Sequence, residues 1–350
     1  MRCVLLTPLL LLAACDGVAS GLDAGAPDAA IPTVVAPLIR ETPIGFPSIP
    51  APADNALTEA KAVLGKALFF EKRLSRTSEI ACGSCHLQER GFADPNPYSF
   101  GVEGRVGERN APALINMAYT TSFFWDGGVT SLEDQSIAPV QNPLEMDLPL
   151  EQAVARLEGD ARYEQLFAEA FGSGPTPGNY TRAVASFVRT LVSGNSRYDR
   201  YLNGDRDALT PAERRGEQLF NGEKGECFHC HVGFNLTNDR FAHNGSFAEG
   251  DEDVGRERVT LNVADRGRFR VPTLRNVAVS APYMHDGAIA SLDDVLAHYA
   301  AHGSGDPRTD ATIFSIELSP AEQRDIVAFL GALTDEEFLS YPGYRDDTGD

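Results

Sequence analysis

Cysteine, histidine and tryptophan are scarce in this chain, and negative charge outweighs positive charge. The 350 residues include six cysteines, seven histidines and one tryptophan, and 30 Lys and Arg stand against 50 Asp and Glu, a net charge of −20. An acidic surface repels phosphate backbones, which argues against nucleic acid as a partner. No apolar run reaches the roughly 18 residues that a membrane-spanning helix needs. With 43% hydrophobic residues, a chain of this length can build two compact domains.

The first residues have the features of an export signal. Met1 and Arg2 give a positive start, the apolar run 4–12 is too short to span a bilayer, and two alanines precede Cys15. Small residues before a cysteine resemble the bacterial lipobox, so we predict a lipoprotein-type signal peptide over residues 1–15 and a lipid anchor on Cys15. An ordinary secretory signal is the alternative, and both predict export to the periplasm or cell envelope.

The next segment, residues 16–53, is dominated by Pro, Ala, Gly and Asp. This composition buries little apolar surface and is typical of a tether. We therefore expect the folded chain to begin near Asp54.

The pattern C-x-x-C-H occurs twice and uses four of the six cysteines. It comprises Cys82, Cys85 and His86 in one copy and Cys227, Cys230 and His231 in the other. The spacing is that of c-type haem attachment, in which two thiols bond the haem vinyl groups and the adjacent histidine binds the iron. A zinc knuckle and a thiol redox pair are the alternatives. Two matches in an exported chain predict two covalent haems, with His86 and His231 as iron ligands.

The sequence around the two motifs repeats at an offset of 160 residues. The matching groups are Pro112-Ala113-Leu114 with Pro272-Thr273-Leu274, Asn116 with Asn276, Trp125-Asp126-Gly127 with His285-Asp286-Gly287, and Ser131-Leu132 with Ser291-Leu292. This indicates an internal duplication, and we predict an N-terminal haem domain over 54–205 and a C-terminal haem domain over 206–340.

Most of the remaining sequence has a helical period. Apolar residues recur at helical spacing in 150–157, 163–167, 180–191 and 326–333, and Thr58, Thr210 and Ser319 stand where helix caps are expected. Only 258–263 has the alternation of a strand. The predicted fold class is mainly α, with two cytochrome c-like haem domains related by the duplication.

The sixth position of each iron separates two classes of function. An iron with two strong protein ligands carries electrons, whereas an open iron binds a small molecule such as peroxide. In the second half the candidates are Tyr299, His298 and His302, and the spacing alone does not choose among them. At the 160-residue offset Tyr299 corresponds to Pro139, which has no group that binds iron.

The first half supplies no replacement for the missing ligand. No histidine lies between His86 and His229, and the local methionines are Met117 and Met146. Near Pro139 stand polar residues, among them Gln135 and Glu145. A carboxylate above an open haem can accept a proton from peroxide and return it to the leaving hydroxyl. Glu145 is a candidate for that role, and a surface acid is the alternative.

From Asn55 to Phe338 the sequence resembles the bacterial di-haem cytochrome c peroxidases and their MauG-like relatives. The matching stretches are 57–69, 82–86, 109–114, 124–126, 131–135, 142–146, 189–195, 282–287 and 326–330. The resemblance implies an enzyme that acts on hydrogen peroxide with two c-type haems.

The resemblance also implies roles for single residues. Trp125 matches the tryptophan that relays electrons between the haems, and Gln135 and Glu145 match the polar pair at the peroxide-binding haem. A calcium ion between the haems is implied as well. Its ligands here are expected to be Asn110 and the backbone carbonyls of Ser280 and Pro282, an oxygen-only set that suits calcium.

Two positions assign the chain to the MauG-like branch of the family. Relatives that need reductive activation carry a distal histidine where this chain has Val102, and a methionine ligand where it has Tyr299. The branch implies peroxide-driven oxidation of an external protein, a companion exported protein. The alternatives are peroxide reduction with electrons from a small cytochrome c or cupredoxin, and a di-haem electron carrier. One departure is Gly225, where the protein that gives the branch its name has a surface tryptophan.

Overall fold

The computed structural model describes residues 36–247 and 250–347 and is mainly helical, as predicted. The predicted signal peptide, Cys15 and residues 16–35 of the predicted tether lie outside the described residues. The longer helices are α1 (Glu59–Phe69), α5 (Leu150–Ala155), α6 (Ala161–Phe171), α7 (Pro177–Thr190), α8 (Arg197–Leu202), α9 (Pro211–Phe220), α11 (Leu292–Ala300), α13 (Pro320–Gly331) and α14 (Glu336–Ser340). One-turn helices are α2 (Cys82–Cys85), α3 (Leu132–Gln135), α4 (Ala138–Gln141), α10 (Glu257–Thr260) and α12 (Ala311–Phe314).

Strands are nearly absent from the described part of the chain. β1 (Phe241–Ala242) and β2 (Phe269–Arg270) form one antiparallel pair. None of the described helices combines the length and the apolar character that crossing a bilayer requires.

The predicted helix starts are confirmed by side-chain caps. Thr58 accepts the backbone N–H of Lys61 at the start of α1. Thr210 and Ser319 begin α9 and α13, each with a capping box that satisfies N–H groups the first turn leaves free.

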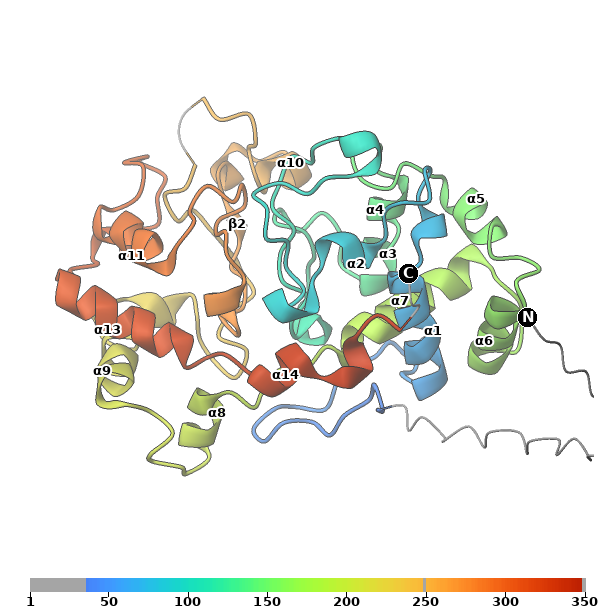
Figure 1. Ribbon diagram of the computed structural model, residues 1–350. Coiled ribbons are helices and arrows are strands. Elements are labelled where there is room, and N and C mark those ends of the chain that lie inside the picture. The colour runs from blue at the N-terminus through green and yellow to red at the C-terminus, as the bar shows by residue number, and fades with distance from the viewer. Residues whose placement is uncertain (1–35, 248–249, 348–350) are drawn as a thin grey trace, which may run out of the picture. The chain divides into compact units, whose positions relative to one another are not determined.

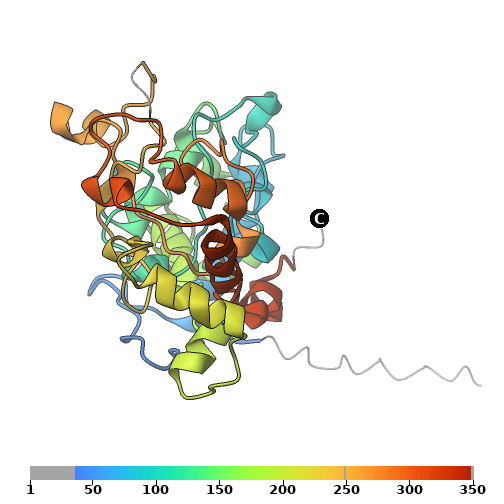
Figure 2. The same cartoon turned by 90° about the vertical axis from the view of Figure 1, so that its left-hand side faces the viewer.

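A pair of crossing helices forms the core of each half, and each pair meets at a glycine. A Cβ on Gly65 of α1 would lie 1.9 Å from the carbonyl oxygen of Ala183 in α7, and a Cβ on Gly216 of α9 would lie 1.9 Å from that of Asp325 in α13. Only glycine permits this approach. Figure 1 shows α1 crossing α7 and α9 beside α13, and the yellow α9 and red α13 remain together in the turned view of Figure 2.

The duplication predicted from the sequence recurs in the backbone, with one difference that matters for function. Ser131 caps α3 and Ser291 caps α11 through equivalent hydrogen bonds. α11 then continues through Tyr299, whereas α3 ends at Gln135 and α4 begins three residues later. Pro139 explains the break, because a proline ring clashes with the carbonyl four residues before it and has no N–H to donate.

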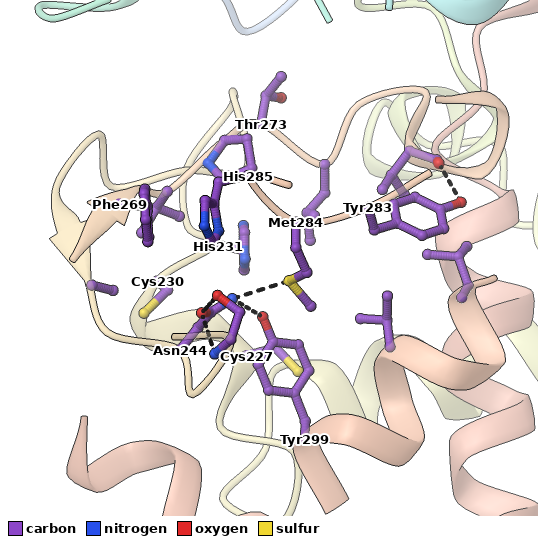
Figure 3. Close-up of a pocket in the computed structure, with 18 of the residues that line it drawn as sticks. Cys227, Cys230, His231, Asn244, Phe269, Thr273, Tyr283, Met284, His285 and Tyr299 are labelled. Carbon is purple, nitrogen blue, oxygen red and sulfur yellow. Dashed lines mark hydrogen bonds between the residues drawn. The ribbon is translucent and has the colours of Figure 1, made fainter. Parts of the chain in front are cut away.

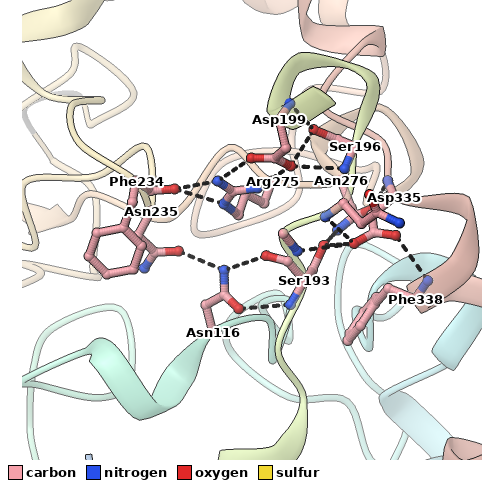
Figure 4. Close-up of polar contacts among 12 residues, drawn as sticks. Asn116, Ser193, Ser196, Asp199, Phe234, Asn235, Arg275, Asn276, Asp335 and Phe338 are labelled. Carbon is pink, nitrogen blue, oxygen red and sulfur yellow. Dashed lines mark hydrogen bonds and ion pairs between the residues drawn. The ribbon is translucent and has the colours of Figure 1, made fainter. Parts of the chain in front are cut away.

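A buried network of asparagines joins the two halves (Figure 4). Asn116 donates to Ser193 O and to Asn235 Oδ1, both at 3.0 Å, and accepts Ser193 N–H at 2.9 Å. Asn276, its counterpart, accepts Asp335 N–H at 2.7 Å and donates to Ser193 Oγ at 2.9 Å. Both asparagines are fully buried. Because their amide groups are hydrogen-bonded, the network fixes the chain segments that follow α7 and α13.

The expected strand over 258–263 is wrong. The segment forms part of α10 and a 3-10 turn, and Leu261 between them has the left-handed φ of 56°. The alternating residues Val259, Leu261 and Val263 are 39%, 87% and 66% exposed, so the pattern does not mark a buried face. A period of two predicts a strand only where one face is covered.

The packed chain begins before Asp54. Leu38 is 1% exposed, its N–H donates to Glu59 at 2.7 Å, and the Phe46 ring contacts Phe234. The last described residues also return to the first half, where Tyr344 is buried in a core that contains residues of α1 and α7. The chain on both sides of the predicted domains therefore contributes to the body that carries the sites.

Candidate haem sites

A cavity in the first half brings together the residues predicted around the first motif. Its lining includes Cys82, Cys85, His86, Gln135, Pro139, Glu145 and Met146. Gln135 comes from the end of α3, Pro139 from α4, and Glu145 from the loop that follows. Of the described residues that line this first cavity, His86 is the single histidine. Met117 does not line it, but Met146 does.

Glu145 is held at this cavity rather than in solvent. Asn142 Nδ2 donates to Glu145 Oε1 at 2.7 Å, and Glu145 O accepts the N–H of Val102 at 2.8 Å. Burial raises the pKa of the Glu145 carboxyl, although the Asn142 hydrogen bond opposes the shift. The alternative of a plain surface acid does not fit this position.

A second cavity surrounds the second motif. Cys227, Cys230, His231 and Tyr299 all line it. His298 lies beside the cavity with Nε2 3.1 Å from Asn244 O, and His302 packs against Phe314. Neither belongs to the lining, so of the three residues proposed from the α11 sequence only Tyr299 does. Burial raises the pKa of Tyr299 to about 12, with an opposing hydrogen bond from Asn244.

Two residues that the sequence did not single out meet Tyr299 in the second cavity. Figure 3 shows Asn244 between the Tyr299 hydroxyl and the Met284 sulfur. Asn244 Nδ2 lies 3.3 Å from Tyr299 Oη and 3.2 Å from Met284 Sδ. The second cavity thus contains a second possible iron ligand, a thioether.

Two further histidines line the second cavity. His243 is fully buried, with Nδ1 3.3 Å from Gly245 N and Nε2 3.8 Å from Asp306 Oδ1. His285 stacks on Phe269 with ring centroids 3.7 Å apart. The scarcity of histidine therefore distinguishes the first cavity, which has one, from the second, which has three.

The segment 110–114 separates the two cavities. Asn110, Pro112 and Ala113 line the second cavity, whereas Ala111 and Leu114 line the first. Trp125 also lines the second cavity, and its Nε1 donates to Asn110 O at 2.8 Å. The single tryptophan is therefore hydrogen-bonded to the wall that both cavities share.

The residues expected to bind calcium, Asn110, Ser280 and Pro282, all line the second cavity. Asn110 Nδ2 donates to Asn96 O at 2.9 Å. Among the described residues, no three His, Cys, Asp or Glu side chains form a metal site.

Comparison with known proteins identifies the family. The model for di-haem cytochrome c peroxidases matches residues 59–207. Methylamine utilization protein MauG of Methylorubrum extorquens strain AM1 is 39% identical over 291 residues, which are 83% of this chain and 82% of the relative. The chain belongs to the family of di-haem cytochrome c peroxidases and MauG.

Other members of this di-haem peroxidase family are similarly close. Cytochrome c peroxidase Ccp of Escherichia coli strain K12 is 36% identical over 294 residues, 82% of this chain and 61% of the relative. The crystal structure of a MauG-like protein associated with microbial copper homeostasis matches with a TM-score of 0.84 and 34% identity, covering 88% of this chain and 98% of that one. The protein is thus an oxidoreductase acting on peroxide, and its family implies two c-type haems.

Both cavities of the di-haem peroxidase fit the haems that the family implies. His86 Nδ1 lies 2.6 Å from Phe92 O and His231 Nδ1 lies 3.1 Å from Leu236 O, so donation there leaves each Nε2 free for iron. Cys82 and Cys85 line the first cavity and Cys227 and Cys230 line the second, where their sulfur atoms would bond the haem vinyl groups.

A buried arginine also contributes a positive charge to the second cavity of this family member. Arg270 lines the cavity and is 4% exposed, and Asp239 Oδ1 lies 3.9 Å from its guanidinium. A haem propionate is an anion that such a group can pair with.

Proposed function

We propose that this protein is a MauG-like peroxidase that uses hydrogen peroxide at the first haem to oxidise an external protein. The observation that carries the proposal is the first cavity, where Glu145 and Gln135 share the lining with Pro139 in place of a tyrosine or histidine. The second haem would be closed by His231 and Tyr299 and would share the oxidising equivalents.

The haems supply O–O bond cleavage and storage of oxidising equivalents. Glu145, when ionised, accepts a proton from peroxide and returns it to the leaving oxygen. Burial raises its pKa, which makes the carboxylate a better proton acceptor than an exposed one. Gln135 orients the bound peroxide through its side-chain amide.

Trp125 is the proposed relay between the two haems. It is the sole tryptophan, it lines the second cavity, and Nε1 is hydrogen-bonded to segment 110–114, whose other side lines the first. An aromatic ring in this position shortens the gap that an electron crosses.

A calcium ion between the haems is also proposed. The Asn110 side-chain oxygen and the backbone carbonyls of Ser280 and Pro282 would be its protein ligands. Neutral oxygen ligands with water completing the shell suit calcium.

The relatives favour one alternative function. Cytochrome c peroxidases match this chain nearly as well as MauG does, at 36% against 39% identity. In that case a small cytochrome c or cupredoxin would supply electrons for peroxide reduction. The exported location and the lipid on Cys15 are likewise proposals, carried by the N-terminal sequence.

Reaction of the fully ferric protein with peroxide tests the proposed branch. Val102 is fully buried, and its N–H donates to Glu145 O. Relatives that need reductive activation carry a distal histidine at this position, and this chain has no such histidine to displace. We therefore expect the diferric protein to react with one equivalent of peroxide without prior reduction, with spectral changes at both haems in stopped-flow absorbance. Reaction only after one-electron reduction would assign the protein to the cytochrome c peroxidases that need activation.

A further inference from the structure

Asn244 holds a fixed orientation beside the proposed ligand of the second haem. Its Oδ1 accepts two hydrogen bonds from Ser246, from the backbone N–H at 3.1 Å and from Oγ at 2.7 Å. Because the oxygen is committed to Ser246, Nδ2 must face the cavity. There its two N–H groups are directed to Tyr299 Oη at 3.3 Å and Met284 Sδ at 3.2 Å.

The backbone around Asn244 is joined to α11 and the loop that follows it. Asn244 O lies 3.1 Å from Nε2 of His298, the residue before Tyr299. Gly245 O accepts the N–H of Ser304 at 2.8 Å, and a Cβ on Gly245 would lie only 2.7 Å from the Cα of Gly303. The donor and the tyrosine are therefore positioned by one connected set of contacts.

We propose that Asn244 is a positioning residue that sets how strongly Tyr299 donates to the iron of the second haem. The inference rests on the proposed ligation of that iron by Tyr299. An N–H donor withdraws charge from a phenolate oxygen and so weakens its donation to iron. It stabilises the ferrous state relative to the ferric state, because the oxygen retains more negative charge when the iron is reduced.

The same amide also holds the sulfur of Met284. A thioether favours the ferrous state more than a phenolate does. With one N–H on each donor atom, Asn244 holds the sulfur in a hydrogen bond, and the tyrosine oxygen would then be the atom that binds the iron.

Asn244→Leu removes the donor at similar size. We expect the ferric state of the second haem to be favoured about tenfold, a fall of about 59 mV in midpoint potential for one electron. The potential is measured by spectroelectrochemical titration of the phenolate-to-iron charge-transfer band, which reports this haem alone. Asn244→Ser retains an oxygen that can accept the Ser246 N–H but is too short to reach Tyr299, and it should lower the potential similarly.

Asn262→Leu is the matched control. Asn262 makes the same local turn, with Oδ1 accepting the N–H of Ala264 at 3.1 Å, but it is exposed and does not line the second cavity. Its removal should leave the potential unchanged. Unchanged potentials in both Asn244 variants, or loss of the charge-transfer band in them, would overturn the tuning role. If Tyr299→Phe keeps the band, the ligation by Tyr299 fails, and that is a separate result.

Discussion

Glu145→Gln is expected to slow peroxide-driven oxidation by about 10²-fold or more, because the amide cannot accept the proton that peroxide must lose. The substitution keeps the shape of the side chain and the Asn142 contact region, so the haem should remain attached. The measurement is the rate of reaction of the ferric protein with peroxide under single-turnover conditions.

The pH dependence of the same rate tests the proton-accepting role of Glu145 independently. Burial raises the pKa of Glu145, and the ionised form is the one that accepts the proton. The wild-type rate should therefore be low at pH values below this raised pKa and should increase as the pH rises through it. In Glu145→Gln this dependence should be absent.

Glu103→Gln is the matched control for the loss of a carboxylate. Glu103 is exposed and pairs with Arg76 and Arg105 at 2.8 Å. Surface ion pairs contribute little, so this variant should react at the wild-type rate. If Glu145→Gln reacts with peroxide as fast as this control, Glu145 has a structural role and is not the acid–base group.

Tyr299→Phe is expected to abolish the phenolate-to-iron charge-transfer band and to raise the midpoint potential of the second haem on the order of 100 mV, within the roughly 0.8 V range that axial ligands span. The phenolate is an anionic donor that stabilises ferric iron, and phenylalanine offers no donor. The absorption spectrum and a redox titration of the ferric protein check both effects.

Met284 is the residue that we expect to replace Tyr299 as the iron ligand. Its sulfur shares the Asn244 amide with Tyr299, so in Tyr299→Phe we expect it to bind the iron and keep the second haem low-spin. The double variant with Met284→Leu should then become high-spin. Tyr283→Phe is the control, since Tyr283 lines the same cavity but donates to Val277 O at 3.0 Å. An unchanged spectrum in Tyr299→Phe would point to His243 or His285 instead.

The haem-attachment motifs and the helix caps could be predicted because each is defined by residues a few positions apart. The correspondence between Pro139 and Tyr299 could be predicted because the two repeated stretches keep a constant offset of 160 residues. The structure shows the consequence of this one difference for the backbone: Pro139 lies where α3 and α4 are separate, whereas α11 continues through Tyr299.

Contacts between distant segments could not be predicted in this way. Asn244 reaches Tyr299 across 55 positions, and no local pattern marks an asparagine as a hydrogen-bond donor to a ligand. The positions of His243 and His285 in the lining of the second cavity could not be predicted either, because no local pattern distinguishes them from the other five histidines. The expected strand over 258–263 failed because its alternating apolar residues are exposed, and exposure is a tertiary property.

Electron paramagnetic resonance of the ferric protein with both haems distinguishes an open iron from a closed one. We expect one high-spin signal from the haem on His86 and one low-spin signal from the haem on His231, in equal amounts. Cyanide should convert only the first. Two low-spin haems before cyanide is added would mean that neither iron is open, and would point to Met146, the thioether that lines the first cavity, as the ligand that closes it.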